Sequence, residues 1–71
     1  MQDRKDDENL MIVSTAEEYA FLHHMNMVEV LGLFKKNNIN STLRSQYDVL
    51  HMLDIRDSVS LVEKILGRQA V

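Results

Sequence analysis

The stretch DIRDSVSLVEKILG, residues 54–67, carries the clearest structural signal in this sequence. Asp54 with Asp57 three residues later is a pattern that caps the start of a helix, and Gly67 suits the position just after the last turn. The stretch therefore predicts an amphipathic helix with one buried face. Four aliphatic residues recur at helical spacing and share that face: Ile55, Val59, Val62 and Leu66.

The segment before this helix predicts a turn followed by another helix. Residues 37–40 read Asn-Asn-Ile-Asn, and asparagine tolerates left-handed backbone and bonds to nearby main chain. Ser41 then offers an N-cap. We therefore expect a helix that starts after Ser41 and places four apolar side chains on one face: Leu43, Tyr47, Leu50 and Leu53.

Asn26 marks a further boundary, because Asn26 and Glu29 have the spacing of a capping box. A helix is expected over residues 27–36, with Lys35 and Lys36 at the C-terminal end that favours cations. The earlier segment, from about residue 7, predicts a helix as well. Two alternatives remain for it: a start at residues 14–15 after an extended lead-in, or one uninterrupted helix over residues 15–36. Its apolar face would hold Ile12, Ala16, Tyr19, Ala20 and His23.

The length and composition predict one small helical domain. The 71 residues include no proline, two glycines and no cysteine, so loop signals are scarce and disulfides are excluded. We expect an all-α fold, a compact bundle of three to four short helices over residues 7–71, after a disordered polar tail at residues 1–6. No apolar run approaches the roughly 20 residues of a membrane span, so we expect a soluble, cytoplasmic protein.

The motif Tyr47-Asp48-Val49-Leu50-His51 is the best candidate for a site. On a helix, Tyr47 and His51 lie four residues apart and Asp48 and His51 three apart, so both pairs can meet. An Asp–His pair can fix an imidazole tautomer for general-base chemistry. A domain this small has little room for a substrate pocket, so we expect no enzymatic activity. The motif either packs Tyr47 and Leu50 into the core or contacts a ligand or partner.

Three pieces of the sequence, read in order, resemble one family. They are residues 29–36 (EVLGLFKK), Ile39 and the motif Tyr47-Asp48-Val49-Leu50-His51. The family consists of small bacterial proteins classed as a domain of unknown function, and its members are often encoded beside ADP-ribosyltransferase-like proteins. The resemblance implies a non-enzymatic partner protein of the antitoxin kind, whose target would be a larger ADP-ribosyltransferase-like toxin. It identifies no catalytic residue.

The three histidines do not predict a metal site. His23 and His24 are adjacent, so on a helix their side chains point about 100° apart. The sequence also lacks the His-Glu-x-x-His spacing and the thiolates that are typical of zinc sites. We therefore expect neither a metal nor a cofactor.

A helix-turn-helix DNA-binding regulator is the alternative function. The helix over residues 27–36, the Asn-rich turn and the helix after it have the required order. Arg44 and Gln46 are residue types that read base edges, and Thr42 and Ser45 would lie beside them. The net charge of −3 and the acidic Asp48 argue against nucleic acid as a ligand.

Protein–protein interaction is therefore the function that the sequence favours. Phe21 follows Glu17 and Glu18 at helical spacing, so an aromatic ring falls on the acidic side of its helix and indicates an interface. We also expect the free protein to form a homo-oligomer, most simply a twofold dimer, because so small a chain has a thin core. The candidate partner-binding residues are Phe21, Met25, Tyr47, Asp48, His51 and Met52.

Overall fold

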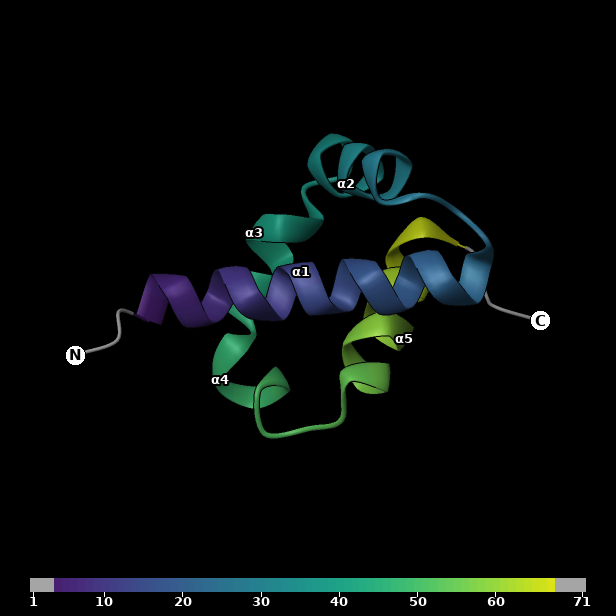
Figure 1. The fold of residues 1–71 in the computed structure, drawn as a ribbon. Helices are drawn as coiled ribbons and strands as arrows, with labels where there is room; N and C mark the ends of the chain where they lie inside the picture. Colours follow the sequence, from purple (N-terminus) through teal and green to yellow (C-terminus); the bar gives the residue numbers. More distant parts are fainter. Residues whose placement is uncertain (1–3, 68–71) are drawn as a thin grey trace.

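The longest helix, α1 (Arg4–His23), lies at the centre of the structure, and the other helices pack around it (Figure 1). The computed structural model describes residues 4–67, which form five helices and contain no strand. The expected all-α class is confirmed, although five helices replace the expected three or four, because the third is broken. The helices after α1 are α2 (Met27–Lys36), α3 (Ile39–Ser45), α4 (Tyr47–Leu50) and α5 (Ile55–Leu66).

Helix α1 begins earlier than its sequence indicates. The expected start near residue 7 and the tail at residues 1–6 are wrong for residues 4–6, which are helical; residues 1–3 lie outside the described part. The Arg4 Nε atom donates to the Glu8 carboxylate at 3.0 Å, a contact one helical turn away that supports this first turn. The apolar face is as expected, with Ile12, Ala16, Tyr19 and Ala20 buried.

A sharp turn separates α1 from α2. His24 has a left-handed φ of 55° and ends α1, and Asn26 then caps α2 by accepting the Glu29 backbone N–H at 2.9 Å. The Glu29 carboxylate accepts the Asn26 N–H in return, at 3.5 Å. The expected capping box is confirmed, and the alternative of one helix over residues 15–36 is wrong.

The helix expected after Ser41 differs most from the prediction. Helix α3 begins two residues before Ser41, after Asn38, which has the left-handed φ of 56° that asparagine tolerates. The helix then breaks at Gln46, with φ −108° and ψ 13°, and the chain continues as the short helix α4. Because of this break, Leu50 is buried while Leu53, expected on the same face, is 51% exposed.

Helix α5 agrees with its sequence signal. Asp54 and Asp57 form the capping box, and Gly67 ends the helix with a φ of 68°, a conformation that glycine adopts at no steric cost. Val59 and Val62 are buried, and α5 packs against α1. The boundaries and the buried face were therefore both predictable from local sequence.

The core lies between α1 and the helices that surround it. Tyr19 of α1 is fully buried and meets Phe34 of α2 edge to face, with ring centroids 6.2 Å apart. The radius of gyration, 11.4 Å, is that of a compact chain of this length. Among the described residues, no helix has both the length and the apolar character needed to cross a membrane.

Candidate functional site

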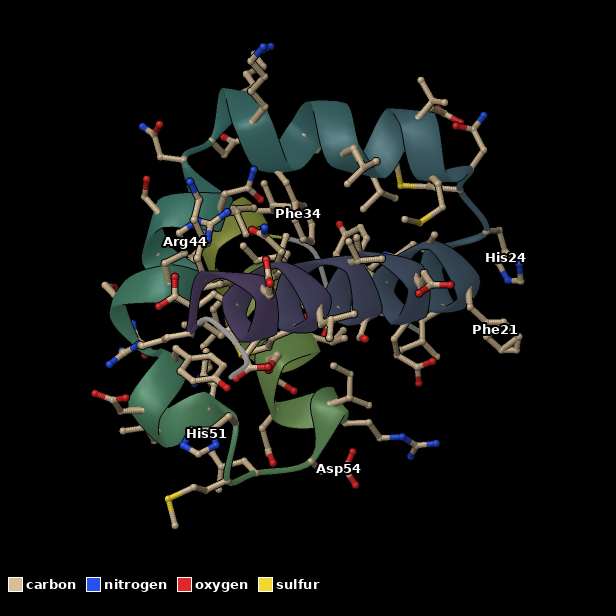
Figure 2. The ribbon with its side chains drawn as sticks, turned by 60° about the vertical axis from the view of Figure 1, so that its left-hand side comes forward. Phe21, His24, Phe34, Arg44, His51 and Asp54 are labelled. Carbon is tan, nitrogen blue, oxygen red and sulfur yellow. The ribbon has the colours of Figure 1, made fainter. Side chains whose placement is uncertain are left out.

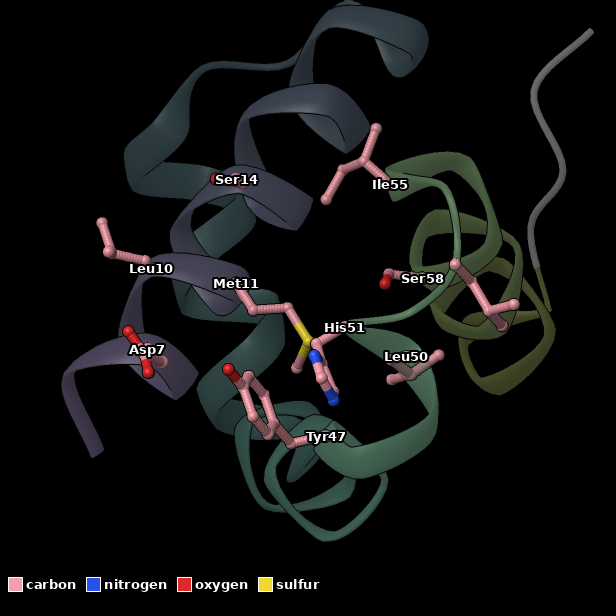
Figure 3. Close-up of a pocket in the computed structure, with 10 residues that line it drawn as sticks. Asp7, Leu10, Met11, Ser14, Tyr47, Leu50, His51, Ile55 and Ser58 are labelled. Carbon is pink, nitrogen blue, oxygen red and sulfur yellow. The ribbon is translucent and has the colours of Figure 1, made fainter. Parts of the chain in front are cut away.

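A pocket of about 300 Å³ opens beside the motif that the sequence singled out (Figure 3). One wall comes from the first half of α1, another from α4, and the floor from the start of α5. Aliphatic side chains and methionine make up half of its lining, and polar or aromatic side chains make up the other half. We call it the Tyr47 pocket, and its lining residues are Asp7, Leu10, Met11, Ser14, Tyr47, Leu50, His51, Leu53, Ile55 and Ser58.

Tyr47 and His51 form one wall of this pocket as a stacked pair. Their ring centroids are 4.7 Å apart and the rings are inclined by 11°. The stack follows from their spacing of four residues, because the His51 backbone N–H donates to the Tyr47 carbonyl at 2.9 Å. Tyr47 is half-buried and His51 exposed, so the alternative that packs Tyr47 and Leu50 into the core holds for Leu50 and only in part for Tyr47.

Ser58 contributes the most unusual polar group. Its side chain is 1% exposed, yet its hydroxyl finds no hydrogen-bond partner among the described residues. Figure 3 shows the hydroxyl directed toward the pocket. A buried hydroxyl without a partner is unfavourable, and this group is the one buried polar atom of the pocket lining whose hydrogen-bonding capacity is unused among the described residues.

Asp48 does not pair with His51. Its carboxylate is exposed and receives the Arg4 guanidinium at 3.1 Å, and Arg4 also lies 5.4 Å from the centre of the Tyr47 ring. No hydrogen bond joins Asp48 and His51 within residues 4–67, so the arrangement of a general base is not formed. Hydrogen bonding to Glu8 and the negative charge of Asp48 raise the pKa of Arg4.

The side chains expected to read DNA bases are used inside the fold. Arg44 donates to Glu8 at 3.2 Å and to the Asn9 side chain, which ties α3 to α1 (Figure 2). The Thr42 hydroxyl donates to the Asn38 carbonyl at 3.2 Å and the Ser45 hydroxyl to the Thr42 carbonyl at 2.8 Å. Of the two predicted base readers, Arg44 is therefore engaged within the fold, whereas the Gln46 side chain makes no such hydrogen bond among residues 4–67.

The histidines do not converge on one point. His23 contacts the Glu63 carboxylate at 2.8 Å and stacks on Tyr19, with ring centroids 4.0 Å apart. His24 is exposed at the turn after α1, and His51 belongs to the Tyr47 pocket. The described residues contain no cluster of three His, Cys, Asp or Glu side chains that could hold a metal ion.

The six predicted partner-binding residues occupy different places. Tyr47 and His51 line the pocket, while Asp48 and Met52 point to solvent near it, Met52 being 78% exposed. Phe21 is 71% exposed, as expected, but lies at the other end of the molecule from His51 (Figure 2). Met25 is half-buried against the core between α1 and α2.

Sequence reasoning missed most of the pocket's lining. Leu10 and Ser14 come from α1 and Ser58 from α5, so only the packing of these helices brings them beside Tyr47. Leu10 carried a usable local signal, because its position departs from the apolar face defined by Ile12 and Ala16. In the structure the Leu10 side chain is accordingly 60% exposed. Ser58 carried none, because a serine within a helix is ordinary.

Comparison of the chain with family models, with curated proteins and with solved structures finds no match.

Proposed function

We propose that this chain is a non-enzymatic module that binds a larger protein through the Tyr47 pocket. The observation that carries the proposal is the exposed apolar rim of this pocket. Leu10 is 60% exposed and Leu53 51% exposed, and Met52, next to Leu53 in the chain, is 78% exposed. Apolar side chains gathered around a concave site are typical of protein interfaces.

The chemistry of the pocket defines the kind of side chain that would enter it. An apolar side chain with a polar tip would cover Leu10 and Leu53 and give the Ser58 hydroxyl a hydrogen bond. Asp7 lines the pocket and the protein carries a net charge of −3. Lys or Arg residues flanking the anchor in the partner would therefore be favoured.

The resemblance to the family of small bacterial proteins supports the identity of the partner. It implies an ADP-ribosyltransferase-like protein, toward which this chain would act as an accessory or antitoxin-like subunit. A dedicated inhibitor of that kind needs a few well-placed anchors more than a large surface. The Tyr47–His51 stack beside an apolar rim offers such anchor sites.

Co-purification with the product of the neighbouring gene tests the proposal directly. Leu53→Asp places a charge on the rim of the pocket and should abolish co-purification. Val28→Asp, the same change at an 82% exposed position on α2, should not. Equal co-purification of the partner with Leu53→Asp and with Val28→Asp would show that the pocket is not the interface. A lack of co-purification by the unmodified chain would refute the partner class.

A second variant separates binding from folding. Ser58→Ala removes a hydroxyl without a partner and should leave the free energy of unfolding unchanged or raised. If the partner bonds to this hydroxyl, the same change should weaken binding about tenfold, which corresponds to roughly 1.4 kcal/mol. Salt-sensitive binding to duplex DNA, lost in Gln46→Ala but kept in Leu53→Asp, would support the DNA-binding alternative instead.

A further inference from the structure

Gly32 lies in the middle of α2, and no contact among residues 4–67 requires a glycine there. Glycine in a helix interior is less favourable than alanine, and Gly32 has no left-handed backbone that would require it. Apart from its chain neighbours and the adjacent backbone of α2 itself, a Cβ atom added at Gly32 would come within 4 Å of no group among the described residues. The packing of this chain on itself therefore does not explain the glycine, whereas the close approach of another molecule would.

Gly32 belongs to a groove of about 410 Å³ on the outer side of α2. The groove follows the helix surface, because its members are spaced by three and four residues. Val28, next to it on α2, is 82% exposed, the most exposed of the large apolar side chains in the described part. The lining residues are Met25, Glu29, Gly32, Leu33 and Lys36.

The order of these residues makes the groove complementary to itself. Glu29 and Lys36 are seven residues apart and carry opposite charges, with Gly32 and Leu33 at the midpoint between them. If two such helices cross antiparallel about that midpoint, each Glu29 faces Lys36 of the other copy. In the same arrangement, the Leu33 side chain of each copy lies over the other copy's Gly32, where a Cβ atom is missing.

We propose that a second copy of this chain binds here, through antiparallel packing of α2 on α2. Both charged side chains are exposed. Glu29 also accepts the Asn26 N–H, but at 3.5 Å, and this long contact involves only one of its two carboxylate oxygens. One helix of ten residues per copy is a small interface, so the dimer is weak and reversible.

This dimer goes beyond the proposed partner binding and leaves it unobstructed. Helices α2 and α4 lie on opposite sides of α1 (Figure 1). Each copy in the dimer therefore keeps its Tyr47 pocket open. Binding of a partner and dimerisation can be measured separately, and a variant that abolishes one should not abolish the other.

Charge reversal with complementation is the decisive experiment. Lys36→Glu makes two carboxylates face each other in the dimer, and Glu29→Lys makes two ammonium groups do so. By sedimentation velocity, the dissociation constant of the dimer should be raised at least about tenfold in each variant alone, relative to the unmodified chain. An equimolar mixture of the two variants restores both attractive pairs and should associate again. If either variant dimerises as the unmodified chain does, or the mixture stays monomeric, the proposal is wrong.

Two further variants control for charge and for folding. Lys35→Glu makes the same change in charge on the neighbouring, exposed residue outside the groove and should leave dimerisation unchanged. Gly32→Ala should weaken dimerisation without lowering the thermal stability of the dilute monomer, because only the second copy occupies the space of the added methyl group. Equal effects of Lys35→Glu and Lys36→Glu, or normal dimerisation by Gly32→Ala, would also overturn the proposal.

Discussion

Replacing Tyr19 by phenylalanine is expected to stabilise this protein, although Tyr19 is fully buried at the centre of the core. The Tyr19 hydroxyl has no hydrogen-bond partner among the described residues. A buried polar group without a partner costs about 1–3 kcal/mol. The ring itself would stay in place, stacked on His23 and edge-on to Phe34.

The net gain follows from two opposing contributions. Removing the oxygen leaves a void on the order of 10 Å³, which costs about 0.3 kcal/mol. Subtracting this from the cost of the unpaired hydroxyl leaves a gain of about 1 kcal/mol or more. For a domain of 60–100 residues, 1 kcal/mol corresponds to a rise in Tm of roughly 4–8 °C.

Urea denaturation followed by circular dichroism gives the measurement, with Tyr47→Phe as the control. Tyr47 is half-buried and its hydroxyl is not among the buried unpaired groups, so its replacement should change stability by less than about 0.5 kcal/mol. Loss of a typical hydrogen bond costs about 1 kcal/mol. If Tyr19→Phe lowers the free energy of unfolding by about that much or more, the hydroxyl is bonded and the reasoning fails.

Three other changes test separate features of the fold. Asp54→Ala removes the N-cap of α5 and should destabilise the protein by about 1 kcal/mol in urea denaturation, whereas an unchanged midpoint would show that the capping box is unimportant. Glu63→Ala leaves the His23 ring nitrogen without its partner and should cost about 1–3 kcal/mol, while Glu63→Gln, which can keep a hydrogen bond, should cost less; equal losses would contradict this. Gly32→Ala should raise the free energy of unfolding of the dilute monomer by about 0.5–1 kcal/mol, and a decrease would mean that the added methyl group clashes with another part of the chain.

Local sequence was sufficient wherever a helix boundary depends on neighbours in the chain. The capping boxes at Asn26 and Asp54 and the glycine at position 67 act within one turn of the residues that they cap. Their effect is therefore visible in a sequence window of a few residues. The boundaries of α2 and α5 and the buried face of α5 could be predicted for this reason.

The errors occur where distant contacts decide the backbone. Nothing near Gln46 signals a break, since neither glycine nor proline is present there. The break lets α4 turn and bury Leu50, and α4 then packs on α3 and α5. The early start of α1 likewise involves Arg4, which pairs with Asp48 of α4. Such contacts cannot be derived from helical periodicity.

In the candidate site, too, local sequence predicted some features, and contacts between distant parts of the chain decided the others. Tyr47 and His51 could be selected from sequence because their spacing puts them together on one helix. The opposite wall at Leu10 and the floor at Ser58 come from parts of the chain that meet only in the folded state. The sequence therefore located one wall of the pocket but not its shape or its unpaired hydroxyl.

The packing of the last helix on the first also determines when this chain can fold. His23 and Glu63, which join α1 to α5, are 40 residues apart, whereas α1 and α2 meet across a short turn that closes quickly. During synthesis the chain leaves the ribosome from its N-terminus, so α1 appears long before α5. The apolar face of α1 then stays partly uncovered until α5 emerges. Chains that terminate before α5 should consequently be captured by chaperones or degraded.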